Sequence, residues 1–209
     1  MSFLSFPVLL LASFLAGSIP SAWIAVRLLK GQNISELGSG NPGATNVFRV
    51  AGWKAALPVF LVDFMKGFLP VFLASSGMLP RFWNLSSSTV ALAAGTASVL
   101  GHVFSPWMRF RGGKGVATGA GMFTALSPPS AIVCALVFSA VLGLSRRMSL
   151  ASLSAAVALP VSLFVLPRML GETPDYAVFV FGSAISLGVF LRHRGNISKL
   201  IQGLEAPLF

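Results

Sequence analysis

Long apolar runs separated by short polar stretches constrain the fold of this chain more than any other feature of its sequence. Only 10% of the 209 residues are charged and 55% are hydrophobic, whereas an ordinary soluble domain carries about 25% charged residues. Apolar runs of this length cross a lipid bilayer as helices, because a helix satisfies its own backbone hydrogen bonds. The sequence therefore predicts an all-α, polytopic membrane protein.

The positions of these runs give the predicted membrane spans. The longer runs cover residues 3–29, 53–77, 86–105, 130–145, 149–166 and 176–191, and a shorter run covers 116–126. In the first run, Ser18, Pro20 and Ser21 interrupt the apolar pattern, which predicts a kink. Arg27 and Lys30 follow this run and no cation precedes it, so we expect a retained span whose N-terminus lies outside.

The short run at 116–126 decides the predicted topology. A helix needs about 20 residues to cross a bilayer, so this segment either crosses with help from its flanks or is re-entrant. If it crosses, only Arg81 and Arg168 lie opposite the other loop cations. If it is re-entrant, the basic residues at 146–147 and in the C-terminal tail lie on the opposite side of the membrane from the first two loops. The positive-inside rule favours crossing. We therefore predict seven transmembrane helices, one of them short around 112–126, with a cytoplasmic C-terminus.

The formal net charge is +10, from 15 Lys and Arg against 5 Asp and Glu. In a soluble protein this balance would suggest nucleic acid. Here the cations stand at the ends of apolar runs, which fits membrane topology and an anionic ligand. Cys134 is the single cysteine, which excludes a disulfide framework and a cysteine zinc site. We expect one membrane domain over residues 1–209, without a metal, a cofactor or a nucleic-acid partner.

The first polar island, residues 38–49, is rich in glycine and neutral polar side chains. Its glycines allow positive φ angles, and successive amides in such a loop can form a concave site for an anion. Arg49 adds a planar guanidinium that suits phosphate. The alternative is an ordinary turn-rich loop with an interfacial arginine. The residues expected to contact phosphate are Gly38, Ser39, Gly40, Asn41, Gly43, Thr45, Asn46 and Arg49.

The second island, residues 102–114, ends at Lys114 within the glycine-rich turn at residues 112–115. Such a turn leading into a helix favours an anion, with the lysine as a point charge. It is not a nucleotide-binding P-loop, because Lys114 is followed by Gly115 and Met108 stands where that motif needs its first glycine. The alternative is a turn with basic interfacial anchors. We expect Gly112, Gly113, Lys114 and Gly115 to bind phosphate and His102 to be a structural hydrogen-bonding residue.

The third island begins at Arg192. If it is helical, His193 and Asn196 lie on one face, three residues apart. A histidine at a membrane interface can transfer protons near neutral pH or donate to an oxyanion. The alternative is a basic tail that contacts anionic lipid head groups. Glu205 is expected to form a structural ion pair in this basic region.

Asp63 and Lys66 are charged residues inside a predicted span. Charged residues within a membrane suggest function by default. The spacing of i, i+3 nevertheless lets these two side chains neutralise each other. We therefore expect a buried structural pair.

The three islands together resemble the three cytoplasmic motifs of the acyl-phosphate-dependent glycerol-3-phosphate acyltransferases of bacterial inner membranes. The motifs occur in the correct order, and the similarity extends over essentially the whole chain. Gly195 departs from the pattern, at a position where the family commonly has a charged residue. The matching stretches run from Gly38 to Arg49, from Asp63 to Gly67, from Gly101 to Thr118 and from Arg192 to Ile197.

The resemblance implies a transfer of the acyl group of acyl phosphate to the 1-hydroxyl of glycerol 3-phosphate. The products are 1-acylglycerol 3-phosphate and phosphate, in the first acylation of phospholipid synthesis. It also implies a multi-pass protein of the inner membrane, surrounded by lipid, with a cytoplasmic active site, no cofactor and an acyl-phosphate-supplying enzyme as partner. The implied catalytic residues are Ser39, Arg49, Lys114, His193 and Asn196.

The residues themselves favour direct attack of the glycerol hydroxyl on the acyl carbonyl, because no nucleophile–base–acid triad is evident. The H-x-x-x-x-D motif of thioester-using acyltransferases is also missing. Five residues after His102 stands Trp107, and five after His193 stands Ser198.

In this hypothesis Arg49 and Lys114 clamp phosphate groups, and Ser39 binds the head of acyl phosphate. His193 and Asn196 orient the acceptor or the developing oxyanion. His193 or the donor's own phosphate takes the proton, and the sequence leaves both open. One rival is a transporter of a phosphorylated solute, which would place its site near the midplane. A second rival is a metal-dependent head-group transferase, which five scattered acidic residues cannot easily support.

Overall fold

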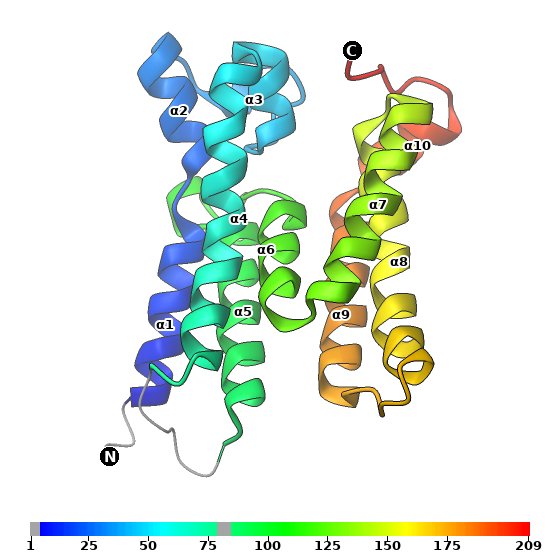
Figure 1. Cartoon of the computed structure of the whole chain (residues 1–209). Coiled ribbons are helices and arrows are strands. Elements are labelled where there is room, and N and C mark those ends of the chain that lie inside the picture. Colours follow the sequence, from blue (N-terminus) through cyan, green and yellow to red (C-terminus); the bar gives the residue numbers. More distant parts are fainter. Residues whose placement is uncertain (1–4, 79–84) are drawn as a thin grey trace. The chain divides into compact units, whose positions relative to one another are not determined.

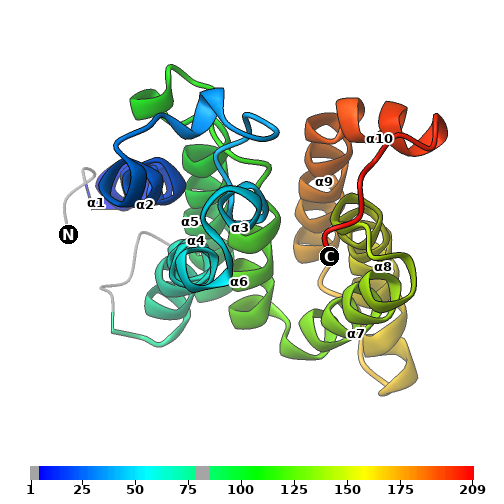
Figure 2. The ribbon, with the colours of Figure 1, turned by 90° about the horizontal axis from the view of Figure 1, so that it is seen from above.

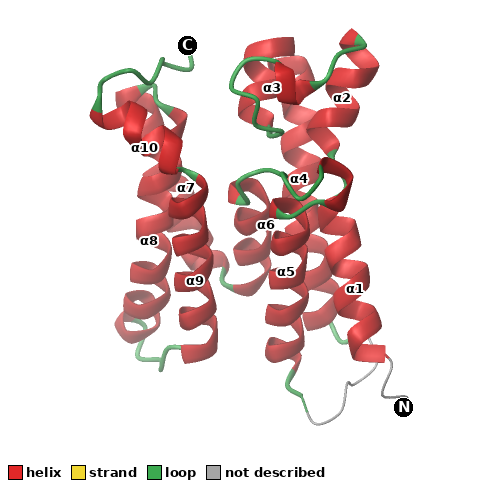
Figure 3. Ribbon diagram, turned by 180° about the vertical axis from the view of Figure 1, so that it is seen from behind, coloured by secondary structure: helices red, strands yellow, loops and turns green. Residues whose placement is uncertain are grey.

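The computed structural model of the protein describes residues 5–78 and 85–209. All regular secondary structure in these residues is helical (Figures 1 and 3), which confirms the predicted all-α class. Arg81, which the predicted topology places opposite the other loop cations, lies outside the described residues. The helices are α1 (Ser5–Ser18), α2 (Ser21–Lys30), η1 (Ile34–Glu36), α3 (Ala44–Ala51), α4 (Trp53–Ser75), α5 (Ser87–Val103), η2 (Pro106–Met108), α6 (Val116–Leu126), α7 (Pro128–Ser145), α8 (Met148–Met169), α9 (Tyr176–Arg192) and α10 (Arg194–Ile201).

Five helical segments of the described chain are long and apolar enough to cross a membrane. They are Phe6–Lys30, Trp53–Ser75, Ser87–Met108, Pro128–Ser145 and Met148–Met169. Helices α9 and α10 add a sixth if this pair, bent by 61°, counts as one span. The remaining predicted span is α6, whose 11 residues extend only about 16 Å. The polytopic class is thus confirmed, while the count of seven and the orientation of the termini stay predictions.

The chain divides into two compact units, Met1–Leu126 and Ser127–Phe209. A single domain over residues 1–209 stays a prediction. In the first unit, glycines let helices approach closely, as is common in membrane proteins. A Cβ on Gly17 of α1 would collide with the backbone of Ser98 in α5, and a Cβ on Gly67 of α4 would collide with the backbone of Thr118 in α6. Backbone-to-backbone contact therefore fixes α1 against α5 and α4 against α6.

The first span is broken where the sequence predicts a kink. α1 ends at Ser18 and α2 begins at Ser21, with Pro20 as its N-cap residue. Proline has no amide hydrogen, so it cannot continue the hydrogen-bond ladder of α1. α2 nevertheless lies almost in line with α1 (Figures 1 and 2). The break therefore exposes backbone polar groups inside the unit without redirecting the chain.

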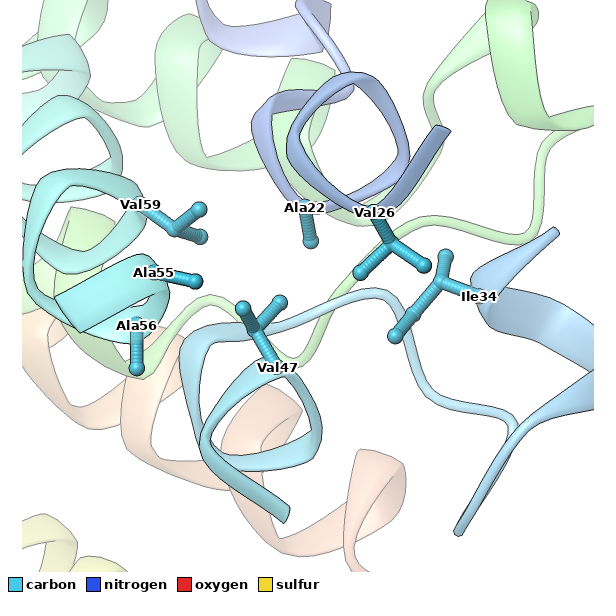
Figure 4. Packing of buried hydrophobic residues seen from close by; sticks show 7 residues of the cluster. All are labelled: Ala22, Val26, Ile34, Val47, Ala55, Ala56 and Val59. Carbon is cyan, nitrogen blue, oxygen red and sulfur yellow. The ribbon is translucent and has the colours of Figure 1, made fainter. Parts of the chain in front are cut away.

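Helix α3 begins within the first island, which the sequence predicts to be a glycine-rich loop, and this corrects that expectation. The helix forms because its apolar side, centred on the buried Val47, joins a hydrophobic cluster between α2, η1 and α4 (Figure 4). The cluster consists of Ala22, Val26, Ile34, Val47, Ala55, Ala56 and Val59. This packing holds the glycine-rich stretch at residues 38–43 between two anchored ends.

In the second unit, α8 packs against α7 and α9. The rings of Phe164 in α8 and Phe179 in α9 lie 5.4 Å apart. Asp175 caps α9, because its carboxylate accepts hydrogen bonds from the amides of Ala177 and Val178. The third island is helical from Arg194 onward, where α10 begins. His193 is the N-cap residue of this helix and Asn196 lies in its first turn.

Candidate functional site

Asn46 organises the first island. Its Oδ1 accepts a hydrogen bond of 2.9 Å from the amide of Ser39, and its Nδ2 donates to the carbonyl oxygens of Leu37, at 2.9 Å, and Ile34, at 3.5 Å. Asn46 is 1% exposed, so these bonds form away from water. Gly38, with φ of +55°, has no room for a side chain, because a Cβ would collide with Asn46 Oδ1. Asn46 therefore closes the loop, and the phosphate contact expected for it stays a prediction.

The other polar residues of this island are more accessible. Ser39 and Arg49 are exposed, and Asn41 and Thr45 are partly buried. Gly43 is the N-cap of α3, and its carbonyl accepts the amides of Asn46 and Val47. Gly40, with φ of +71°, completes the turn. Ser39 and Arg49 are thus the most accessible polar side chains of the first island, and their contact with phosphate stays a prediction.

The second island returns along the end of α5. The amide of Gly112 donates to the carbonyl of Val103 at 3.0 Å, and that of Gly113 donates to the carbonyl of His102 at 3.1 Å. These amides therefore anchor the loop to α5. Gly115 has φ of +81°, a conformation that favours glycine, and α6 begins at the next residue. Lys114 is held, half-buried, between these fixed points.

Glycine is required at two of these positions by the contacts of His102. A Cβ on Gly112 would collide with the His102 carbonyl oxygen, and a Cβ on Gly113 would collide with Nε2 of the imidazole ring. That Gly112, Gly113 and Gly115 also cradle an anion stays a prediction. In the structure these glycines set the path of the chain around Lys114.

The first two islands meet at one pocket of the first unit. Its lining combines the break between α1 and α2, one residue of the first island, and several of the second. The lining residues are Ser18, Ile19, Pro20, Ser21, Pro42, His102, Ser105, Met108, Gly112 and Gly113. Pro42 of the first island thus lies beside the second island within this unit.

Two hydrogen bonds fasten the second island to the break in the first span. Ser105 Oγ donates to the carbonyl of Ser18 at 2.6 Å, and Trp107 Nε1 donates to Ser18 Oγ at 3.0 Å. Sequence reasoning did not identify these partners. The sequence does contain part of the evidence for these bonds. The break at Pro20 leaves carbonyl groups of α1 without a partner in the helix, so other groups must donate to them.

The predicted pairing of Asp63 with Lys66 is confirmed, with both side chains buried. The pair is not self-contained. Lys66 Nζ also donates to the carbonyl of Ile19 at 2.6 Å and to Ser21 Oγ at 3.2 Å, and Ser21 donates to Asp63. His102 Nδ1 lies 3.7 Å from Asp63 Oδ1. The charged pair of α4 therefore joins the break of the first span to the end of α5.

In the second unit, His193 is buried at the junction of α9 and α10. Its Nδ1 lies 2.8 Å from the carbonyl oxygen of Val189. A carbonyl only accepts hydrogen bonds, so Nδ1 carries a hydrogen and Nε2 is the basic nitrogen of the neutral ring. This tautomer suits a proton acceptor.

Asn196, in the first turn of α10, has its side-chain amide oriented by two acceptors. Nδ2 donates to Ser149 Oγ at 2.6 Å and to Glu205 Oε1 at 3.3 Å. Glu205 is buried and here accepts from an amide; the ion pair expected for it stays a prediction. Ser149, at the start of α8, was not identified from the sequence. In the described residues, no group of three or more His, Cys, Asp or Glu side chains is arranged to hold a metal ion.

A family model described as glycerol-3-phosphate acyltransferase matches residues 7–203. Relatives with that same name include proteins of Chlorobium phaeobacteroides, 40% identical over 95% of this chain and 94% of the relative, and of Salinibacter ruber, 40% identical over 98% and 93%. A third, from Chlorobaculum tepidum, is 37% identical over 98% and 97%. These matches cover nearly the full length of both chains.

The solved structures that this chain resembles carry the same activity in their names. The glycerol 3-phosphate form of PlsY (YgiH), an integral membrane glycerol 3-phosphate acyltransferase, has a TM-score of 0.84 and 36% identity, covering 97% of this chain and 95% of the other. The lysophosphatidic acid form has a TM-score of 0.79 and 33% identity over the same shares.

Proposed function

This chain belongs to the glycerol-3-phosphate acyltransferase family, and on that premise we infer that it acylates glycerol 3-phosphate to lysophosphatidic acid. It is a multi-pass membrane enzyme. We further propose that the donor is acyl phosphate and that the 1-hydroxyl of glycerol 3-phosphate attacks it. The observation that supports this proposal best is the presence in the first unit of two glycine-rich loops, one followed by Arg49 and the other containing Lys114, since both substrates would carry a phosphate.

Direct attack is proposed in preference to an acyl-enzyme at Ser39, for which His102 would be the base within the first unit. An activated serine needs a base within hydrogen-bond reach. His102, the histidine of this unit, has one ring nitrogen beside Asp63 and the other against Gly113. Both ring nitrogens of His102 therefore face groups other than Ser39. Acyl phosphate is already an activated mixed anhydride, so no covalent enzyme intermediate is needed.

In the proposed reaction, Lys114 and Arg49 hold phosphate groups and neutralise their charge. The bond between the glycerol oxygen and the acyl carbon forms while the bond between that carbon and the phosphate oxygen breaks. The hydroxyl proton passes to His193 Nε2 or to the departing phosphate. Ser39 contacts the donor head group, and Asn196, held by Ser149 and Glu205, orients the acceptor or the oxyanion.

We place the enzyme in the bacterial inner membrane with its active site at the cytoplasmic face. The support is the distribution of loop cations, which the positive-inside rule assigns to the cytoplasm. An enzyme that supplies acyl phosphate is the partner this donor requires. Acyl phosphate is both reactive and lipophilic, so a supply close to the membrane surface is expected.

The test is phosphate release by purified protein given acyl phosphate, with and without glycerol 3-phosphate and with no metal added. We expect acceptor-dependent release, formation of lysophosphatidic acid, and sequential initial-rate kinetics. Ping-pong kinetics would refute direct attack. Turnover with acyl-CoA and none with acyl phosphate would overturn the proposed donor while leaving the acyltransferase activity standing.

A further inference from the structure

The buried cluster of Asp63, Lys66, Ser21 and His102 has more members than a structural ion pair needs. The three N–H groups of Lys66 are matched by three acceptors: Asp63, Ser21 and the carbonyl of Ile19. These three hydrogen bonds explain the position of Lys66, which links α4 to the break in the first span. It does not account for the position of His102 beside the same carboxylate.

The imidazole of His102 lies between Asp63 and the second island. On one edge Nδ1 is 3.7 Å from Asp63 Oδ1. On the other, Nε2 occupies the space that a side chain on Gly113 would need. The ring is 92% buried, since His102 is 8% exposed. A rotation of this ring would therefore displace the glycine turn or break the contact with Asp63.

The turn that touches this ring carries Lys114 directly after it. Gly112 and Gly113 are bonded to the last carbonyls of α5, and Gly115 starts the turn into α6. The chain between these points is short, so the placement of Gly113 fixes the backbone of Lys114. Asp63, through His102, is thus coupled to a residue of the phosphate-binding loop.

We propose that Asp63 and His102 are positioning residues, which hold the Gly112–Gly113 turn so that Lys114 meets the substrate phosphate. This inference rests on the proposed function, because it takes Lys114 to be a phosphate ligand. It assigns Asp63 a second role beside its pairing with Lys66. A charge displaced by about 1 Å from a reacting group lowers catalytic efficiency by up to about 100-fold.

The decisive variant neutralises both charges of the pair. Asp63→Asn alone strands a buried ammonium and is expected to destabilise the protein. Asp63→Asn with Lys66→Met leaves no unpaired charge, and such replacements of buried pairs are often neutral for stability. Lys66→Met also removes the donor to the Ile19 carbonyl, so a purely structural pair predicts a lowered thermal midpoint, or kinetic changes that are additive with those of His102→Gln. Positioning predicts a thermal midpoint close to wild type, with a raised KM for glycerol 3-phosphate or acyl phosphate and kcat/KM lowered about 10- to 100-fold.

The second variant, His102→Gln, is measured alone and in the charge-neutral background. If Asp63 acts through His102, the two effects on kcat/KM are not additive. Ser98→Ala is the matched control, since Ser98 lies one turn earlier in α5 and donates to the carbonyl of Lys66. It should lower stability without changing KM.

The outcomes separate this inference from the proposed function. Activity lost in Lys114→Met but normal in both His102→Gln and the charge-neutral double variant contradicts positioning and leaves the proposed function intact. Additive losses contradict action of Asp63 through His102. Wild-type kinetics in Lys114→Met overturn the assignment of Lys114, and the positioning role falls with it.

Discussion

His193 Nδ1 lies 2.8 Å from the carbonyl oxygen of Val189, one turn earlier in α9. This contact places the hydrogen of the neutral ring on Nδ1, so that Nε2 carries the lone pair. The bond also places the ring at the point where the chain turns into α10. The tautomer of this histidine is therefore set by the backbone of its own helix.

If His193 is the general base, His193→Gln should lower kcat by about 100-fold or more, the usual share of general base catalysis. The low-pH limb of the rate profile should disappear with it. The measurement is kcat against pH for purified variants of equal thermal midpoint. Turnover retained at the wild-type level would assign the proton to the donor phosphate. Ser183→Ala, which removes a hydroxyl bonded to the Phe179 carbonyl in the same helix, serves as the control.

Lys114→Met should raise KM for the phosphate-bearing substrate more than the same change at Arg111. Both residues belong to the second island, but Arg111 is exposed, whereas Lys114 is half-buried and held between fixed glycines. The loss of a charge-assisted hydrogen bond to phosphate costs about 1.5–3 kcal/mol, or roughly 10- to 150-fold in affinity. Equal effects of the two substitutions would contradict a specific contact of Lys114 with phosphate and indicate that both residues act only through the surface charge.

Asn46→Ala should lower stability and activity together. It removes one acceptor and two donor contacts that close the first island, at about 1 kcal/mol for each net hydrogen bond. Asn33→Ala is the matched control, because the hydrogen bonds of Asn33 with Ser35 and Glu36 are exposed to solvent. Thermal unfolding in detergent and KM for each substrate distinguish the two variants. An Asn46→Ala protein with normal stability and a raised KM would instead support direct phosphate contact by Asn46.

Gly67→Ala and Gly143→Ala give a matched pair of helix substitutions. A Cβ at Gly67 would collide with the backbone of Thr118, whereas a Cβ at Gly143 meets nothing within 4 Å. We expect the first to destabilise the protein by about 1–3 kcal/mol through overpacking. The second should be neutral or stabilising by up to about 1 kcal/mol, because alanine favours helix over glycine. Thermal midpoints measured side by side test the close approach of α4 and α6.

Several features of this fold could be predicted from the sequence because they depend on local chemistry. Apolar runs predict helices, a proline with flanking serines predicts the break at residues 19–20, and the i, i+3 spacing predicts the pairing of Asp63 with Lys66. Each of these follows from neighbours along the chain. The family resemblance added what local chemistry cannot supply, namely the reaction.

Features that depend on how distant segments meet were missed. Helix α3 forms inside a glycine-rich stretch because Val47 finds a cluster built by α2 and α4. Asn46 turns inward because the chain before Gly38 places two carbonyls within its reach. The contact of the His102 ring with Gly113 arises only when the second island folds back onto α5. None of these contacts leaves a periodic signal in the sequence.

The break between α1 and α2 also bears on how the protein is made. Lys66 enters the bilayer within α4, and two of its three hydrogen-bond acceptors, Ile19 and Ser21, belong to the first span. A nascent α4 without that span would hold an incompletely solvated ammonium in lipid, which is costly. Insertion of α4 during synthesis is therefore favoured once the first span is already in the membrane, so the biogenesis of these two helices is interdependent.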